Sequence, residues 1–207
     1  MIDPAYQPAL DTLRACIAED RADRHYFVDF DYTLLLTNST DAYLQSARPK
    51  FVFWPILKAL GLARPWVFRG KNSVFLYRDS MRIGVLHTLR PGLKTDYERI
   101  ADQIFETHKN DALISALTPV ASEQITIVSF GLTEIIRTML QNTRFRDCRI
   151  VASTPDRLVA DRARGKLEML KEVGLVPDAE RDVVITDSMR DDQDLLEHVR
   201  HGFHIKW

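Results

Sequence analysis

The sequence has little of what holds disulfide-rich or fibrous proteins together. Its 207 residues include two cysteines, eight glycines and nine prolines. Two cysteines, Cys16 and Cys148, cannot build a disulfide framework. So few glycines and prolines exclude collagen-like and low-complexity chains. What is present, 45% hydrophobic and 28% charged residues, is typical of a globular protein long enough to bury a hydrophobic core.

Long apolar runs are also absent. The most apolar stretch, residues 51–62, is interrupted by Pro55 and Lys58 and is too short to span a bilayer. The first twenty residues have neither the basic nor the apolar region of a secretory signal. We therefore expect a reduced, cytoplasmic protein.

The net charge of −1 conceals an uneven distribution along the chain. Residues 48–94 contain ten of the 28 basic residues and a single acid, Asp79, so this segment carries +9 and the rest carries −10. Aromatic residues are interspersed with these bases: Phe51, Phe53, Trp54, Trp66, Phe68, Phe75 and Tyr77. The near-zero net charge of the whole chain therefore says little about the partners of this segment.

Apolar strand patterns alternate with amphipathic helix patterns over most of the chain. We predict a helix at 5–20, strands at 25–28, 124–129, 148–152, 182–186 and 203–205, and helices at 132–141, 157–173 and 191–201. This alternation predicts a Rossmann-like α/β fold, a mostly parallel sheet with helices on both faces. Residues 40–118 carry only helical patterns. We expect 1–39 and 119–207 to form the core and 40–118 to form an inserted helical cap.

Polar residues follow four of the predicted strands: Asp29, Ser129, Ser153 and Asp187. Ligands of parallel sheets bind beyond the carboxyl ends of the strands. Asp29 and Asp31 are two residues apart at such an end, where both carboxylates can face one cleft. Two ionised carboxylates repel each other, and Mg²⁺, which prefers oxygen ligands, relieves this repulsion. The alternative is an Asx-turn or helix cap without further function.

Three further features extend this hypothesis. Asp187 can supply a distant metal ligand, and Asp191 or Asp192 can orient a neighbouring cation, although acids also suit a helix N-terminus. Ser129, followed by Phe130 and Gly131, can bind a phosphate or simply cap a helix. Lys166 can supply an ammonium group, although most lysines are solvated surface residues.

Taken in this order, the motifs resemble the haloacid dehalogenase (HAD) superfamily over about 130 residues. Motif one corresponds to Asp29-x-Asp31-x-Thr33, motif two to Ser129, motif three to Lys166 and motif four to Asp187-Ser188-x-x-Asp191. The phosphoserine-phosphatase-like branch, with a helical cap after motif one, looks nearest. A fainter likeness is to HAD domains fused to membrane prenyltransferases. The sequence departs from the family pattern at Tyr32, where a small residue is usual, and at Thr186, where glycine is frequent.

The resemblance implies a Mg²⁺-dependent phosphatase that hydrolyses a small phosphate monoester through an aspartyl-phosphate. Asp29 would be the nucleophile and Asp31 the general acid and base. Mg²⁺ would be held by Asp29, Asp187 and the backbone carbonyl of Asp31. Ser129 and Lys166 would hold the phosphate, Thr33 would support the motif-one loop, and Asp191 would support motif four. Dehalogenases of the family lack the second aspartate, so Asp31 favours phosphoryl chemistry.

The basic cap leaves several interpretations open. Its aromatics can form a small core with Lys and Arg pointing outward, its charge can attract phosphorylated substrates, or residues 51–62 can contact an anionic membrane. No nucleic-acid-binding motif is recognisable, and we expect no nucleic acid partner. A HAD-like domain acting only as a binding or regulatory module is the alternative function. Three histidines near the C-terminus, His198, His201 and His204, match no metal-binding pattern.

Overall fold

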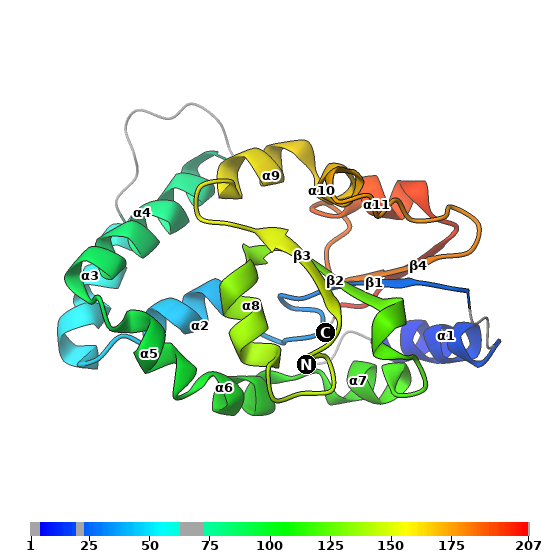
Figure 1. The fold of residues 1–207 in the computed structure, drawn as a ribbon, viewed down its shortest axis with the longest axis horizontal. Helices are drawn as coiled ribbons and strands as arrows, with labels where there is room; N and C mark the ends of the chain where they lie inside the picture. The colour runs from blue at the N-terminus through cyan, green and yellow to red at the C-terminus, as the bar shows by residue number, and fades with distance from the viewer. Residues whose placement is uncertain (1–4, 20–22, 63–72, 207) are drawn as a thin grey trace.

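The computed structural model describes residues 5–19, 23–62 and 73–206, with the side chains of 61, 62 and 73–79 left out. Five strands form one sheet in the order β3-β2-β1-β4-β5, and every neighbouring pair is parallel (Figure 1). The protein therefore has the predicted Rossmann-like α/β fold. The strands are β1 (Tyr26–Asp29), β2 (Ile125–Leu132), β3 (Arg149–Ser153), β4 (Val183–Thr186) and β5 (His201–His204).

The helices fall into two groups along the chain, those before β2 and those after it. Before β2, they are α1 (Tyr6–Ala18), α2 (Ser39–Gln45), α3 (Lys50–Leu62), α4 (Ser73–Leu89), α5 (Leu93–Glu98), α6 (Ala101–His108), α7 (Asp111–Leu117) and the short 3₁₀ helix η1 (Ser122–Gln124). After β2, they are α8 (Thr133–Leu140), α9 (Leu158–Arg164), α10 (Lys166–Glu172) and α11 (Gln193–His198). None of the described helices is long and apolar enough to cross a membrane.

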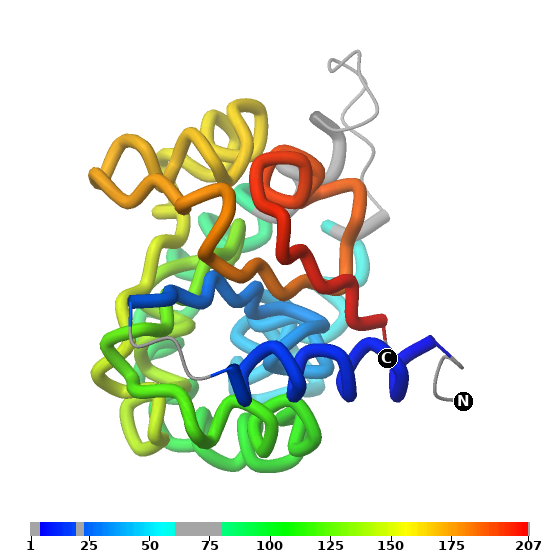
Figure 2. The backbone as a smooth tube through the Cα atoms, turned by 90° about the vertical axis from the view of Figure 1, so that its right-hand side faces the viewer, coloured from blue at the N-terminus to red at the C-terminus, as the bar shows by residue number. Residues whose placement is uncertain are grey.

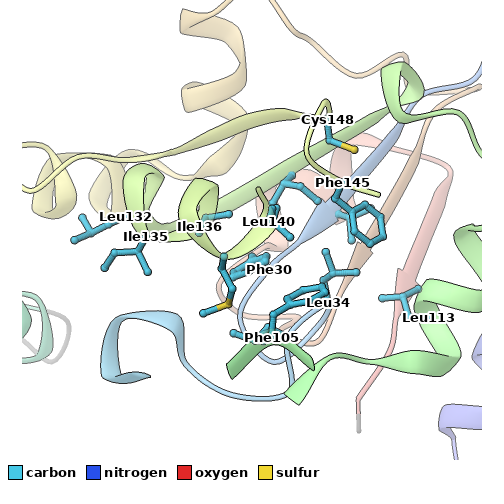
Figure 3. Packing of buried hydrophobic residues seen from close by; sticks show 14 of the residues in the cluster. Phe30, Leu34, Phe105, Leu113, Leu132, Ile135, Ile136, Leu140, Phe145 and Cys148 are labelled. Atoms are coloured by element: carbon cyan, nitrogen blue, oxygen red, sulfur yellow. The ribbon is translucent and has the colours of Figure 1, made fainter. Parts of the chain in front are cut away.

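Alternate residues of the central strands point to opposite faces of the sheet, as strand geometry requires. Val28, Ile127 and Ile185 belong to a core that also includes residues of α1, α7 and α8. Phe27 and Val184 belong to a separate core with residues of α10 and α11. Because both faces are covered, the central strands β1, β2 and β4 are mostly apolar, and the polar residues at their ends are the exceptions (Figures 1 and 3).

The strand order reverses direction next to β1, which positions a ligand site. From β1 the chain goes outward through β2 to β3, and it then returns across the sheet to β4, on the other side of β1. At such a switch point the connections leave the strand ends in opposite directions, and a crevice opens between them. Asp29 ends β1 and Asp187 directly follows β4, so both lie at this crevice.

The helices of residues 40–118 do not all lie in one place. Helices α3 and α4 pack on each other beyond one end of the sheet, and α4 also contacts α9 (Figure 1). Helix α6 packs on α8, and α7 packs on α1, the blue helix in the lower part of Figure 2. Of the basic and aromatic residues noted above, Arg64, Arg69, Lys71, Trp66 and Phe68 lie outside the described residues.

The single helix predicted over 157–173 was wrong. The chain breaks at Gly165, with φ of +92°, so that α9 ends at Arg164 and α10 begins at Lys166. A side chain at 165 would collide with Asp194, whose carboxylate accepts a hydrogen bond from the Leu167 N–H at 2.7 Å. This contact from α11 stabilises the start of α10, and the periodicity of the sequence contains no sign of it.

Candidate active site

A tight turn after β1 brings Asp29 and Asp31 to the same pocket. The Leu35 N–H donates to the Phe30 carbonyl at 2.9 Å, and the Phe30 side chain is fully buried in the core (Figure 3). Tyr32, which directly follows Asp31, has a φ of 62°. This left-handed conformation is uncommon for a non-glycine residue. The turn thus directs both carboxylates into the crevice at the end of the sheet.

Thr33 joins motif one to motif four. Its Oγ1 lies 3.1 Å from Asp29 Oδ2 and 3.2 Å from Asp187 Oδ1, and it accepts a hydrogen bond from the Asp187 N–H at 2.9 Å. Burial raises the pKa of both aspartates, and the negative charge of Asp187 raises that of Asp29 further. The buried hydroxyl therefore holds two carboxylates together that would otherwise repel each other.

Lys166 is the first residue of α10 and lies fully inside the site, with 2% of its surface exposed. Its Nζ is 2.5 Å from Asp29 Oδ1 and 2.7 Å from Asp192 Oδ1. Burial lowers the pKa of this lysine, but the two carboxylates outweigh that effect and raise it overall. An ammonium group this deeply buried requires such paired charges, so the solvated surface role considered for Lys166 does not apply.

Of the two aspartates between which the sequence did not decide, Asp192 lies beside Lys166, and the supporting role of Asp191 stays a prediction. Asp191 is exposed and forms an ion pair with Arg162 at 3.3 Å. Asp192 is 1% exposed and also accepts a hydrogen bond from the Thr186 hydroxyl. Thr186, at the position where the HAD pattern often has glycine, thus orients the carboxylate that holds Lys166.

Asp31 is held separately from the Asp29–Asp187 pair. Its Oδ1 accepts a hydrogen bond from the Ser39 N–H at the start of α2, at 2.7 Å. Burial raises the pKa of Asp31 to about 7, and the charge of Asp29 acts in the same direction. A carboxyl group with this pKa exchanges protons near neutral pH, which suits a general acid and base.

Ser129 and Gly131 form the wall of the pocket next to Asp31. The Ser129 hydroxyl accepts a hydrogen bond from the Gly131 N–H at 2.9 Å, so Ser129 does not cap α8. A Cβ at Gly131 would lie 3.3 Å from Asp31 Oδ2 and 3.2 Å from both Ser129 Oγ and Ser39 Oγ. These contacts are so close that a larger residue at 131 would displace its neighbours.

The candidate active-site pocket has a volume of about 180 Å³ and is lined by most of the site residues predicted from the sequence. Asp29, Asp31, Ser129, Lys166, Asp187 and Asp191 all line it, whereas Thr33 lies beneath it. Tyr32, which stands where a small residue is usual in the HAD pattern, lines the pocket and is half exposed. Arg162, which sequence reasoning missed, also lines the pocket, with its guanidinium 5.3 Å from the centre of the Phe130 ring.

The chemistry of the site suits a hard divalent cation. Five aspartates and two basic residues line the pocket, and Asp29 and Asp187 offer adjacent carboxylate oxygens, the donors that Mg²⁺ prefers. In the described part of the chain, no three His, Cys, Asp or Glu side chains converge as a metal-binding group. A bound Mg²⁺ would thus complete its ligands with backbone oxygen and water, and the role of the Asp31 carbonyl stays a prediction.

Two residues that support the site were not found by sequence reasoning. Asn110 donates from Nδ2 to the Thr33 carbonyl at 2.9 Å, although its sequence position before α7 predicts only a helix cap. His204 Nε2 lies 2.8 Å from the Asp187 carbonyl oxygen. No sequence signal links either residue to the loops that they contact, which are 77 and 17 residues away.

Comparisons with known proteins give a fold relationship and nothing closer. No family model matches the sequence, and no curated protein is significantly similar to it. A protein of unknown function from Bordetella pertussis Tohama I has the same fold, with a TM-score of 0.57 and 14% identity over 86% of this chain and 88% of that one. A Bacillus subtilis protein assigned as a HAD-hydrolase, bound to magnesium, gives a TM-score of 0.43 and 18% identity over 82% of each chain.

Proposed function

We propose that this protein is a HAD-type phosphatase that hydrolyses a small phosphate monoester. The observation that carries the proposal is the placement of Asp29. Its carboxylate lies at a strand end, 2.5 Å from the Lys166 ammonium and 3.1 Å from the Thr33 hydroxyl, with Asp31 lining the same pocket. A buried carboxylate with a neighbouring cation and a nearby proton donor is equipped for nucleophilic attack on phosphorus.

In the first step, a carboxylate oxygen of Asp29 forms a bond to phosphorus while the ester P–O bond breaks. Asp31 donates its proton to the departing alcohol oxygen, which leaves as a neutral alcohol. In the second step, Asp31 accepts a proton from water as the water oxygen attacks phosphorus. The aspartyl P–O bond breaks, and inorganic phosphate and the Asp29 carboxylate are released.

Lys166 and Ser129 are the residues that we expect to bind the phosphate oxygens. An ammonium group has three donors, and Lys166 directs two of them at Asp29 and Asp192. The third is free to meet a phosphate oxygen, where transition-state charge accumulates. The side chain of Asp192 thereby acts through Lys166 by keeping it charged and oriented.

Mg²⁺, when bound, neutralises the repulsion between the anionic phosphate and the carboxylates around it. We expect dialysis against a chelator to lower the hydrolysis of p-nitrophenyl phosphate at least about tenfold, because such charge neutralisation contributes several kcal/mol. Added Mg²⁺ is expected to restore the rate, whereas added Na⁺ is not. Phosphate release that is unchanged after chelation contradicts a metal-assisted mechanism.

A binding or regulatory role at a membrane is the second candidate, and the exposed face of α3 favours it. Phe51 is 81% exposed and Trp54 57% exposed, while Phe53 and Leu57 on the same helix are buried. The Lys58 ammonium lies 4.4 Å from the centre of the Trp54 ring. Aromatic side chains next to lysines suit the interface of an anionic bilayer.

We therefore expect the protein to sediment with vesicles that contain phosphatidylserine but not with vesicles of phosphatidylcholine alone. The double variant Phe51→Ser, Trp54→Ser is expected to lose this binding, and Val176→Ser, which alters an exposed valine elsewhere, is expected to retain it. High salt should weaken the binding because it screens the lysines. Failure to sediment at low salt, or equal sedimentation of the double variant, rules out this use of α3.

A further inference from the structure

A second pocket, which we call the α8 pocket, lies beside α8 and has no lining residue in common with the active-site pocket. Its volume is about 230 Å³. Residues from α2, α5, α8 and the end of β3 contribute to its walls, among them Tyr43, Tyr97, Leu132, Ile135, Thr138 and Ser153. The phosphatase mechanism uses none of these residues.

Ser153 is the fourth of the polar residues that follow the strands, and the only one of them that the proposed mechanism leaves without a role. Its side chain is 0% exposed, and its Oγ has no hydrogen-bond partner among the described residues. A buried hydroxyl without a partner loses its bond to water and gains nothing in return, which costs stability. Because Ser153 lines the α8 pocket, a ligand in that pocket can provide the missing partner.

The other buried walls of the α8 pocket present carbon surface. The rings of Tyr43 and Tyr97 pack edge to face with their centres 5.1 Å apart. Their hydroxyls are already engaged, since Tyr43 bonds to His87 Nε2 at 2.6 Å and Tyr97 donates to the Ile135 carbonyl at 3.1 Å. The pocket therefore combines apolar and aromatic walls with a buried hydroxyl at Ser153 that has no hydrogen-bond partner among the described residues.

The rim of the α8 pocket carries balanced charge. Lys94 and Glu134 both line the pocket, are both exposed, and approach each other to 3.5 Å. Because the two charges offset each other, the rim gives no preference for an anion or a cation. An uncharged ligand fits this rim and the apolar walls together.

We propose that the α8 pocket binds a small, uncharged aromatic compound that carries a hydroxyl group. The ring would lie between the Tyr and aliphatic side chains, and its hydroxyl would bond to Ser153 Oγ. A cavity of about 150 Å³ is sufficient for benzene in a protein core, so the α8 pocket accommodates one substituted ring. This ligand site goes beyond the phosphatase function and does not depend on it.

The test compares two probes that differ only in the hydroxyl, 4-fluorophenol and fluorobenzene, by ¹⁹F NMR titration of the full chain. We expect 4-fluorophenol to bind more tightly than fluorobenzene. Ser153→Ala should weaken 4-fluorophenol about fivefold, the effect of one hydrogen bond, and leave fluorobenzene unchanged. Thr138→Trp, which adds a large ring at a partly buried position that lines the pocket, should abolish the binding of both probes.

Thr12→Trp is the matched control, because it adds the same ring on the exposed face of α1. It should leave both titrations unchanged, and circular dichroism verifies that each variant is folded. Asp29→Asn should also retain probe binding, so that a failure of the phosphatase mechanism is distinguishable from a failure here. The proposal is overturned if neither probe binds the wild-type chain, if Ser153→Ala affects both probes equally, or if Thr138→Trp still binds them.

Discussion

Replacement of Asp29 by asparagine is expected to abolish phosphate release. Asparagine has nearly the same shape, but its amide cannot form the aspartyl-phosphate, a carboxylic–phosphoric anhydride, so the covalent route is closed. Loss of a catalytic nucleophile lowers turnover by several orders of magnitude, and we expect a decrease of at least about 10⁴-fold. The measurement is Mg²⁺-supported hydrolysis of p-nitrophenyl phosphate, with mass spectrometry of acid-quenched wild-type protein to detect the phosphorylated aspartate.

Asp191→Asn is the matched control for this substitution. It makes the same chemical change on the rim of the same pocket, but Asp191 is exposed and paired with Arg162. We expect its turnover to stay within about threefold of wild type, since an exposed ion pair is worth about 1 kcal/mol or less. Full activity in Asp29→Asn would exclude Asp29 as the nucleophile, and equal losses in both variants would point to a general electrostatic effect.

Replacement of Asp31 by asparagine is expected to separate the two chemical steps. An alkyl phosphate needs a proton on its departing oxygen, so its hydrolysis should fall by about 10²- to 10⁴-fold. The nitrophenolate of p-nitrophenyl phosphate leaves readily without a proton, so its first step should be much less affected. Its second step still lacks the base that activates water, and the phosphorylated protein should accumulate.

Rapid-mixing measurements can distinguish this outcome from a structural defect. The Asp31→Asn variant should release about one equivalent of nitrophenol per protein in a burst and then turn over slowly. The buried Ser39 N–H can still donate to the asparagine carbonyl oxygen, so the loop at the start of α2 is expected to stay in place. A uniform loss with alkyl and aryl phosphates, without a burst, would contradict the role of Asp31 as acid and base.

The sheet was predictable because its three central strands, β1, β2 and β4, are buried on both faces and therefore mostly apolar. Each of the five predicted strand segments overlaps an observed strand within a few residues. The helix over 157–173 was not predictable, because its periodicity continues through Gly165, while the break depends on the contact of Asp194 with the start of α10. The sequence pattern was sufficient for the strands, whose positions depend on burial. It failed for the helix break, which depends on a side chain distant in the sequence.

The candidate site likewise has residues that the sequence pattern identified and residues that only the tertiary contacts identified. The strand ends directed attention to Asp29, Asp31 and Asp187, because carboxylates at the ends of buried strands are conspicuous against an apolar background. The choice between Asp191 and Asp192 could not be made from sequence, since adjacent residues differ there only in the direction of the side chain. Burial of Asp192 at 1% exposure, against the exposed Asp191, settles which of them faces Lys166.

By itself, the sequence determined the α/β class, the strand ends at which polar chemistry collects, and the basic character of residues 48–94. These features follow from periodicity, composition and charge, which can be read along the chain because apolar residues become buried and charged residues stay exposed. Only the tertiary structure placed Lys166, which is 137 residues from Asp29 in the chain, at 2.5 Å from its carboxylate. It also left the Ser153 hydroxyl buried without a hydrogen-bond partner among the described residues, because side chains far apart in sequence meet only when the sheet and helices have packed.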